Sequence, residues 1–121
     1  MSNINYTIWV KEYKDSKFDV KIGYFPDDSY IEDCFDDTEH NINEIAQKIN
    51  MGNLEWFVAR VQVLYDGIEM GCSYLGGCLY EDAYKAVEDG LDGYLEDMIC
   101  EAKEEAVDYF NTLYQKMTHD L

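Results

Sequence analysis

The sequence contains few basic residues. Nine Lys and Arg stand against 26 Asp and Glu in 121 residues, which gives a formal net charge of −17. Direct binding of nucleic acid depends on Lys and Arg that neutralise phosphates, so this composition argues against direct contact with DNA or RNA. A domain with this much excess charge repels itself, and we expect its surface to attract a basic partner.

Long apolar runs are also missing. The sequence has no run of about 18 apolar residues and no basic start followed by an apolar segment, so it predicts neither a membrane span nor a signal peptide. We expect a cytoplasmic protein with no membrane partner. Chains of roughly 100–150 residues most often form one domain, so we expect residues 1–121 to fold as a single domain.

Common motifs of catalytic and metal sites are absent from the sequence. It has no P-loop, GxGxxG, GxSxG, HExxH or CxxC motif. The EF-hand pattern fails at its third position, which is Phe35 for a loop starting at Asp33 and Leu91 for one starting at Asp89. We expect no enzyme activity, no catalytic residue, no cofactor and no metal ligand set. A cation-binding module built on clustered carboxylates stays open as an alternative.

The cysteines are scattered among apolar neighbours. An unpaired cysteine behaves as a small hydrophobic residue, so we expect buried free thiols, with a disulfide left open as an alternative. The four residues concerned are Cys34, Cys72, Cys78 and Cys100.

Alternating apolar and polar residues predict two hairpins. Residues 6–11 and 18–24 alternate in this way, with a turn expected at residues 13–16. A second hairpin over residues 54–75 would turn at Asp66 and Gly67 in the type I′ conformation, and Gly76 and Gly77 would end its strand. Pairing Tyr65 with Ile68 places one set of apolar residues on a shared face. That set is Phe57, Ala59, Val61, Val63, Met70, Cys72 and Tyr74, with Arg60, Gln62, Glu69 and Ser73 on the opposite face.

Helical periodicity predicts short helices over residues 41–51 and 81–88 and a long helix over residues 94–117. The apolar stripe of the long helix is formed by Leu95, Met98, Ile99, Ala102, Ala106, Tyr109, Phe110, Leu113 and Met117. These elements predict an α+β fold. It would be a small antiparallel sheet of about four strands, in two hairpins, covered on one face by a long C-terminal helix and one or two short helices.

Acidic residues concentrate in two parts of the chain. Residues 27–39 are rich in acids, and no basic residue occurs between Lys21 and Lys48. Residues 81–108 hold eleven acids against Lys85 and Lys103. The acids that we expect to contact a partner are Asp27, Asp28, Glu32, Asp33, Asp36, Asp37, Glu81, Asp82, Glu88, Asp89, Asp92, Glu96, Asp97, Glu101, Glu104 and Asp108.

Four acids of the predicted long helix, Asp97, Glu101, Glu104 and Asp108, would form a ridge opposite the apolar stripe. A solvated helix face is the ordinary explanation of such a pattern. Like charges three and four residues apart lower helix stability, however, and no Lys is in register to offset them. The steps along the axis are about 6, 4.5 and 6 Å, comparable to phosphate spacing along a nucleic-acid strand. We therefore expect the ridge to bind a partner.

The second hairpin resembles a known family. The run at residues 58–61 (VARV), followed by Tyr65, Gly67, Gly71 and Tyr74, is similar to the strand-turn-strand signature of ArdA-type antirestriction proteins. Those proteins are acidic DNA mimics carried by plasmids and transposons. In size and charge the chain also resembles anti-CRISPR and other phage antidefence proteins. The resemblance implies inhibition of a host restriction or CRISPR nuclease, in the cytoplasm of the host cell. It assigns no functional residue of that family to a position in this chain, because a mimic contacts its target through distributed carboxylates and not through a motif.

The leading hypothesis is thus a non-enzymatic mimic of nucleic acid that binds a basic nucleic-acid-binding protein. An immunity protein that neutralises a basic nuclease toxin is the alternative. A mimic should lose binding steeply with salt, whereas an immunity protein should rely on a compact aromatic hot spot. Homodimer formation is left open by the sequence.

Overall fold

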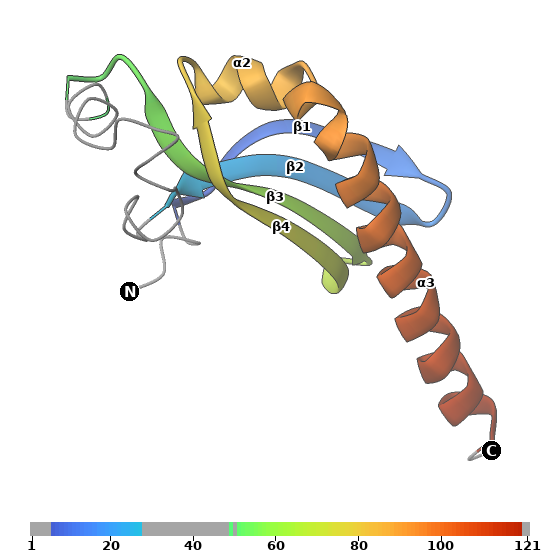
Figure 1. Ribbon diagram of the computed structural model, residues 1–121. Coiled ribbons are helices and arrows are strands. Elements are labelled where there is room, and N and C mark those ends of the chain that lie inside the picture. The colour runs from blue at the N-terminus through green and yellow to red at the C-terminus, as the bar shows by residue number, and fades with distance from the viewer. Residues whose placement is uncertain (1–5, 28–48, 50, 120–121) are drawn as a thin grey trace.

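The structure is a computed structural model that describes residues 6–27, 49 and 51–119. Four strands form one antiparallel sheet in the order β1-β2-β3-β4. Their bounds are Ile8–Asp15 (β1), Phe18–Pro26 (β2), Glu55–Tyr65 (β3) and Ile68–Tyr80 (β4). The helix α2 (Ala83–Glu88), the 3-10 turn η3 (Leu91–Gly93) and the long helix α3 (Tyr94–His119) follow (Figure 1). The predicted α+β fold is confirmed.

One face of the sheet carries the core. The inward side chains of β2 and β3 alternate with outward ones, and α3 lies across β3 and β4 on this face. Ala83 and Val87 of α2 belong to the same core. The buried residues that hold these elements together include Val20, Ile22, Phe57, Ala59, Val61, Val63, Met98, Ala102 and Ala106. Among the described residues, no helix is both long enough and apolar enough to cross a membrane.

The contact between α3 and β4 is unusually close at Gly71. A Cβ placed on this residue would collide with the carbonyl oxygen of Ala102 and lie 2.9 Å from the backbone nitrogen of Ala106. Small residues on both elements therefore let the helix backbone approach the strand backbone directly. This approach fixes which side of α3 faces the sheet.

The Asp66–Gly67 turn is confirmed, but part of the predicted register of its hairpin is wrong. Asp66 and Gly67 have φ values of 50° and 80°, as a type I′ turn requires. Tyr65 pairs with Ile68, yet the register then shifts, so that Val63 pairs with Gly71 and not with Met70.

This irregularity inserts one residue into β4, and a one-residue slip moves every later side chain to the other face. Tyr74 is consequently exposed opposite Arg60, while Ser73, predicted on the polar face, is buried at 5% exposure. Cys72, predicted on the packed face, pairs with Gln62 and is half-buried.

Gly76 and Gly77 do not end the strand as predicted. β4 continues to Tyr80 across a second register shift, where Gly77 takes a φ of 68°. The first hairpin also differs slightly, because β1 runs to Asp15 and the turn lies at Ser16 and Lys17.

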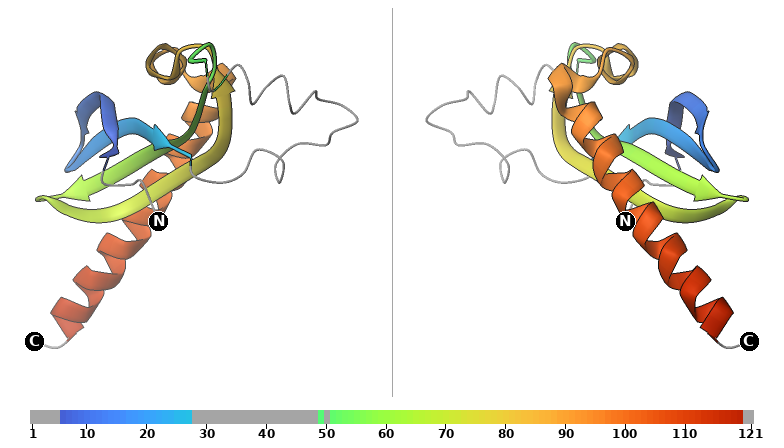
Figure 2. Two further views of the ribbon diagram at one scale, coloured as in Figure 1. Left: turned by 90° about the vertical axis from the view of Figure 1, so that its left-hand side faces the viewer. Right: turned by 90° about the vertical axis from the view of Figure 1, so that its right-hand side faces the viewer.

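The packed stripe of α3 is shorter than predicted. Leu95, Met98, Ala102 and Ala106 are buried, but Tyr109 and Met117 are exposed. The last turns of the helix extend past the end of the sheet (Figures 1 and 2), whereas Phe110 and Leu113 still pack against the core.

The cysteine prediction holds only in part. Cys72, Cys78 and Cys100 are free, but only Cys78 is buried, and Cys100 on α3 is exposed. Cys34 and all but a few residues of the helix predicted at 41–51 lie outside the described part of the chain.

The close approach at Gly71 gives a direct test of the packing. Gly71→Ala should lower the free energy of unfolding by about 1–3 kcal/mol or more, because the added methyl group meets helix backbone that cannot move aside. Gly76→Ala is the matched control in the same strand, since the nearest atom to its Cβ would be an Asp27 oxygen at 3.6 Å. Its stability should change by less than about 0.5 kcal/mol. Urea unfolding followed by circular dichroism measures both, and equal losses would contradict this packing.

Candidate partner-binding surface

The predicted ridge forms on α3. Asp97, Glu101, Glu104 and Asp108 are all exposed, on the side of the helix opposite Ala102 and the other buried residues. Within the described part of the chain, none of the four carboxylates takes part in an ion pair. The four charges consequently face solvent together.

Lys103 lies in the middle of this stretch but points away from the ridge. Its ammonium forms an ion pair with Asp15 on β1 and lies 5.9 Å from the ring centroid of Tyr13. The hydrogen bond to Asp15 raises the pKa of Lys103 above its ordinary value. Helical geometry explains the separation, because residue 103 lies on the sheet side of the helix.

The acids of α2 and η3 extend the negative surface toward the start of α3. Glu81, Asp82, Glu88, Asp89, Asp92 and Glu96 are all exposed. Together with the ridge and Glu105 they bring residues 81–108 to eleven acids against two lysines, a formal charge of −9. More than half of the net charge thus lies on two helices and the turn between them.

Two of these acids also stabilise the fold. Asp82 is the N-cap of α2, and its carboxylate accepts a hydrogen bond from the backbone N–H of Lys85 at 3.1 Å. Asp92 accepts a hydrogen bond from the hydroxyl of Tyr80 at 3.0 Å, in a left-handed backbone conformation with φ of 57°. Sequence reasoning did not identify Glu55, whose carboxylate accepts from the backbone N–H of Ala83 and so holds the start of α2 against β3.

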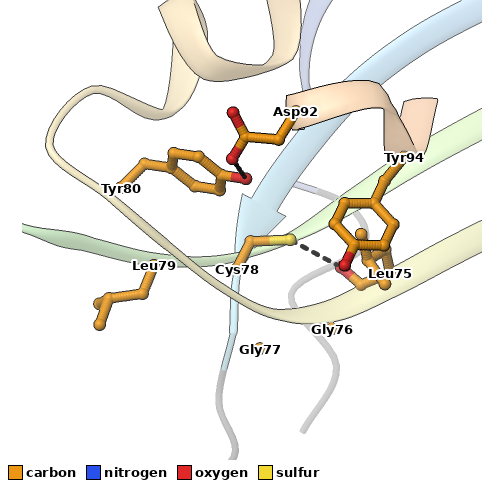
Figure 3. A pocket seen from close by; sticks show the side chains of 8 residues that line it. All are labelled: Leu75, Gly76, Gly77, Cys78, Leu79, Tyr80, Asp92 and Tyr94. Atoms are coloured by element: carbon orange, nitrogen blue, oxygen red, sulfur yellow. Dashed lines mark hydrogen bonds between the residues drawn. The ribbon is translucent and has the colours of Figure 1, made fainter. Parts of the chain in front are cut away.

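An open hollow of about 500 Å³ lies where β4 meets η3 and α3 (Figure 3). Its lining includes Tyr80, Asp92 and Tyr94 along one side and Gly76 to Cys78 of β4 along the other. Tyr94 is exposed at 58% and Tyr80 is half-buried. The hollow therefore combines aromatic surface with one carboxylate, and both groups can contact a cationic side chain.

Cys78, in the same hollow, is not set up as a nucleophile. Its thiol donates to the carbonyl oxygen of Leu75 at 3.2 Å, and burial raises its pKa above the ordinary value. Reactive cysteines have depressed pKa values, so this thiol is in the wrong protonation state for attack. Across residues 6–27, 49 and 51–119, no three His, Cys, Asp or Glu side chains come together as a metal site would require.

The predicted acidic loop is described only at its first residue. The Asp27 carboxylate accepts a hydrogen bond from the backbone N–H of Gly77 at 2.9 Å, and its own N–H donates to the carbonyl of Trp56 at 3.1 Å. Asp27 therefore lies beside the hollow. The remaining predicted loop acids, Asp28, Glu32, Asp33, Asp36 and Asp37, lie outside the described residues.

Basic residues gather on the sheet and engage neighbouring aromatic rings. On the face away from α3, Arg60 lies 5.1 Å from the ring centroid of Trp9 and contacts Thr7, Glu69 and Tyr74. Lys21 likewise lies over the ring of Trp9, at 4.4 Å, whereas Lys17 lies over the rings of Phe18 and of Phe110 on α3, at 5.1 and 4.6 Å. Sequence reasoning missed the Arg60 cluster because the predicted register placed Tyr74 on the packed face.

Comparison with family models, with curated proteins and with solved structures gives no match for this chain.

The bond between Tyr80 and Asp92 predicts a measurable titration. Burial, and then the hydrogen bond to Asp92, raise the pKa of Tyr80 from 10.0 to about 12. The raised pKa means that the protonated Tyr80 hydroxyl contributes to the free energy of unfolding. This contribution has its full size below pH 10 and is lost as the pH rises toward 12. Asp92→Asn removes the charge, so the pKa of Tyr80 should fall while staying above 10.0 because burial remains.

Carbon-13 NMR of the tyrosine Cζ atoms measures this pKa, with Asp89→Asn as a control that removes a neighbouring exposed carboxylate. An unchanged Tyr80 titration in Asp92→Asn would contradict the hydrogen bond.

Proposed function

We propose that the protein is a non-enzymatic inhibitor that binds the basic nucleic-acid-binding surface of a host defence protein, a restriction or CRISPR nuclease. The observation that carries this proposal is the ridge of Asp97, Glu101, Glu104 and Asp108, four exposed carboxylates in a row that form no ion pair with any residue the structure describes. The inhibitor presents carboxylates where the nuclease would bind phosphates. Its proposed place of action is the cytoplasm of the host cell.

The spacing of the ridge supports mimicry of a nucleic-acid strand. Successive carboxylates rise by about 6, 4.5 and 6 Å along the helix axis. Successive phosphates advance by about 3.4 Å along the axis of one strand, so a ridge carboxylate can replace roughly every second phosphate contact. Lysines and arginines arranged for a phosphate backbone can thus meet this helix along its length.

Repulsion between the ridge carboxylates lowers the stability of α3. Each like-charge pair at i,i+3 or i,i+4 costs a helix roughly 0.2–0.5 kcal/mol, and the ridge contains three such pairs. Lys103 does not offset them, because its ammonium is paired with Asp15. Stability alone gives no reason to place acids at these four positions, whereas binding to a basic surface does.

Exposed tyrosines beside the acids are suited to anchor the complex. Tyr84 and Tyr94 are 44% and 58% exposed on α2 and at the start of α3. Charge mainly governs the association rate and the orientation of a complex, while affinity concentrates in a few aromatic or Arg anchors. Tyr94 borders the hollow that also contains Asp92, where a cationic side chain of the nuclease can bind.

An immunity protein for a basic nuclease toxin is the second candidate, and the same hollow favours it. A dedicated one-to-one partner would place its hot spot on the compact group of Tyr80, Asp92 and Tyr94 and depend less on the ridge. Neutralising the ridge then has a small effect, and Tyr94→Ala has a large one. The leading proposal predicts a large effect of neutralising the ridge, with Tyr94→Ala weakening binding as well.

A displacement experiment tests the proposal. The full chain is immobilised and exposed to lysate of cells that carry a restriction or CRISPR system, and bound protein is eluted with either salt or a short DNA duplex. A mimic should capture a nucleic-acid-binding nuclease that duplex DNA releases, because protein and DNA compete for one site. Capture of the nuclease that duplex DNA cannot reverse would count against mimicry.

Matched neutralisation separates the ridge from bulk charge. The ridge variant carries Asp97→Asn, Glu101→Gln, Glu104→Gln and Asp108→Asn. The control carries Asp19→Asn, Asp66→Asn, Glu12→Gln and Glu69→Gln, which also removes two Asp and two Glu charges from exposed positions, all of them on the sheet hairpins. Both variants therefore have a net charge of −13 in place of −17.

The ridge variant should inhibit the captured nuclease at least about 100-fold more weakly than the parent protein, as the loss of several charge contacts implies. The control should inhibit within about threefold of the parent. Nuclease assays at fixed ionic strength give both values, and circular dichroism verifies folding. Equal losses in the two variants would show that bulk charge, not the ridge, is responsible.

A further inference from the structure

The C-terminal half of α3 carries large apolar side chains in solvent. Tyr114 and Met117 are 61% and 69% exposed, and Leu113 is half-buried because it packs against the edge of the core. Figure 2 shows the last turns of the helix extending beyond the sheet in both views. An apolar stripe of this kind on an extended helix is a surface suited to protein contact.

The exposed stripe continues the packed stripe of the same helix. Phe110 marks the boundary, because its ring packs against Tyr65 at 5.1 Å and Phe18 at 6.2 Å at the edge of the core. From Phe110 the apolar positions continue at Leu113, Tyr114 and Met117, in the three- and four-residue steps that let two helices interlock side chains. The helix thus offers to a partner the same kind of face that it offers to the sheet.

The charge of this segment differs sharply from that of the rest of the chain. Residues 109–119 contain no Asp or Glu, and Lys116 is their one Lys or Arg, whereas residues 81–108 hold eleven acids. Two copies with a net charge of −17 repel each other almost everywhere. Asp120 is the next acid after Asp108, so the turns between them are where two copies can approach without bringing Asp or Glu side chains together.

From these observations we infer that two copies of the chain associate through the end of α3, helix against helix, with Tyr114 and Met117 at the centre of the contact and Leu113 at its edge. A basic partner does not fit this segment, since it offers no carboxylate. The Asp97 to Asp108 ridge lies on the opposite side of the helix, so both ridges stay exposed in the dimer. This inference does not depend on the proposed function.

Sedimentation equilibrium of the full chain, from about 1 μM to about 500 μM, tests the inference. The parent protein should approach twice its chain mass of 14.1 kDa as its concentration rises. Tyr114→Asp with Met117→Asp should weaken the dimer at least tenfold. The matched control, Asn111→Asp with Gln115→Asp, adds the same charge to the same segment on the opposite side of the helix and should retain the dimer within about threefold.

Salt distinguishes this contact from binding to a nuclease. Raising the salt concentration screens the repulsion between two acidic copies, so the dimer should strengthen, whereas a complex held by opposite charges weakens. A parent protein that stays monomeric at every concentration would overturn the inference. Equal weakening by both double variants would also overturn it, because the effect would then come from added charge. A monomer that loses nuclease binding in Tyr114→Asp with Met117→Asp would assign the stripe to the nuclease instead.

Discussion

The rest of the structure depends on the close contact of α3 with β4 at Gly71. Because no side chain separates them there, the backbone of the helix lies directly against the strand at Ala102 and Ala106. A helix held this closely has one rotation about its axis. That rotation buries Met98 and Ala102 and turns Glu101 and Glu104 to solvent. The packing of the core and the placement of the acidic ridge are therefore two results of one contact.

Charge is distributed unevenly around this contact. Arg60, Lys17 and Lys21 contact aromatic rings of the sheet, and Lys103 is drawn from α3 to Asp15 of β1. Within the described residues, few positive charges are therefore left to neutralise the acids of α2, η3 and α3. The acids are thus densest on α2, η3 and α3, an arrangement that costs helix stability and gives a field able to attract a basic partner.

Periodicity was sufficient to predict the elements of the fold. Strand alternation, the Asp66–Gly67 turn and the helical stripe located both hairpins and α3, and the same helical geometry placed the ridge on the exposed side. The register beyond Met70 could not be predicted, because a bulge depends on how β4 accommodates α3 at Gly71, which is a long-range contact. The hydrogen bond from Tyr80 to Asp92 and the hollow beside it also arise from residues brought together only in the folded chain. The exposure of Met117 could not be predicted either, since periodicity does not show where a sheet ends beneath a helix.

If the ridge replaces phosphates, the affinity for the nuclease must fall steeply as the salt concentration rises. The dissociation constant of the complex with the captured nuclease is measured by calorimetry at several salt concentrations, for the ridge-neutralised variant, the matched control and the parent protein. The parent and the control should show a steep dependence and the ridge variant a clearly shallower one, because its neutral side chains no longer pair with the basic surface. The same slope in all three proteins would contradict replacement of phosphates by the ridge.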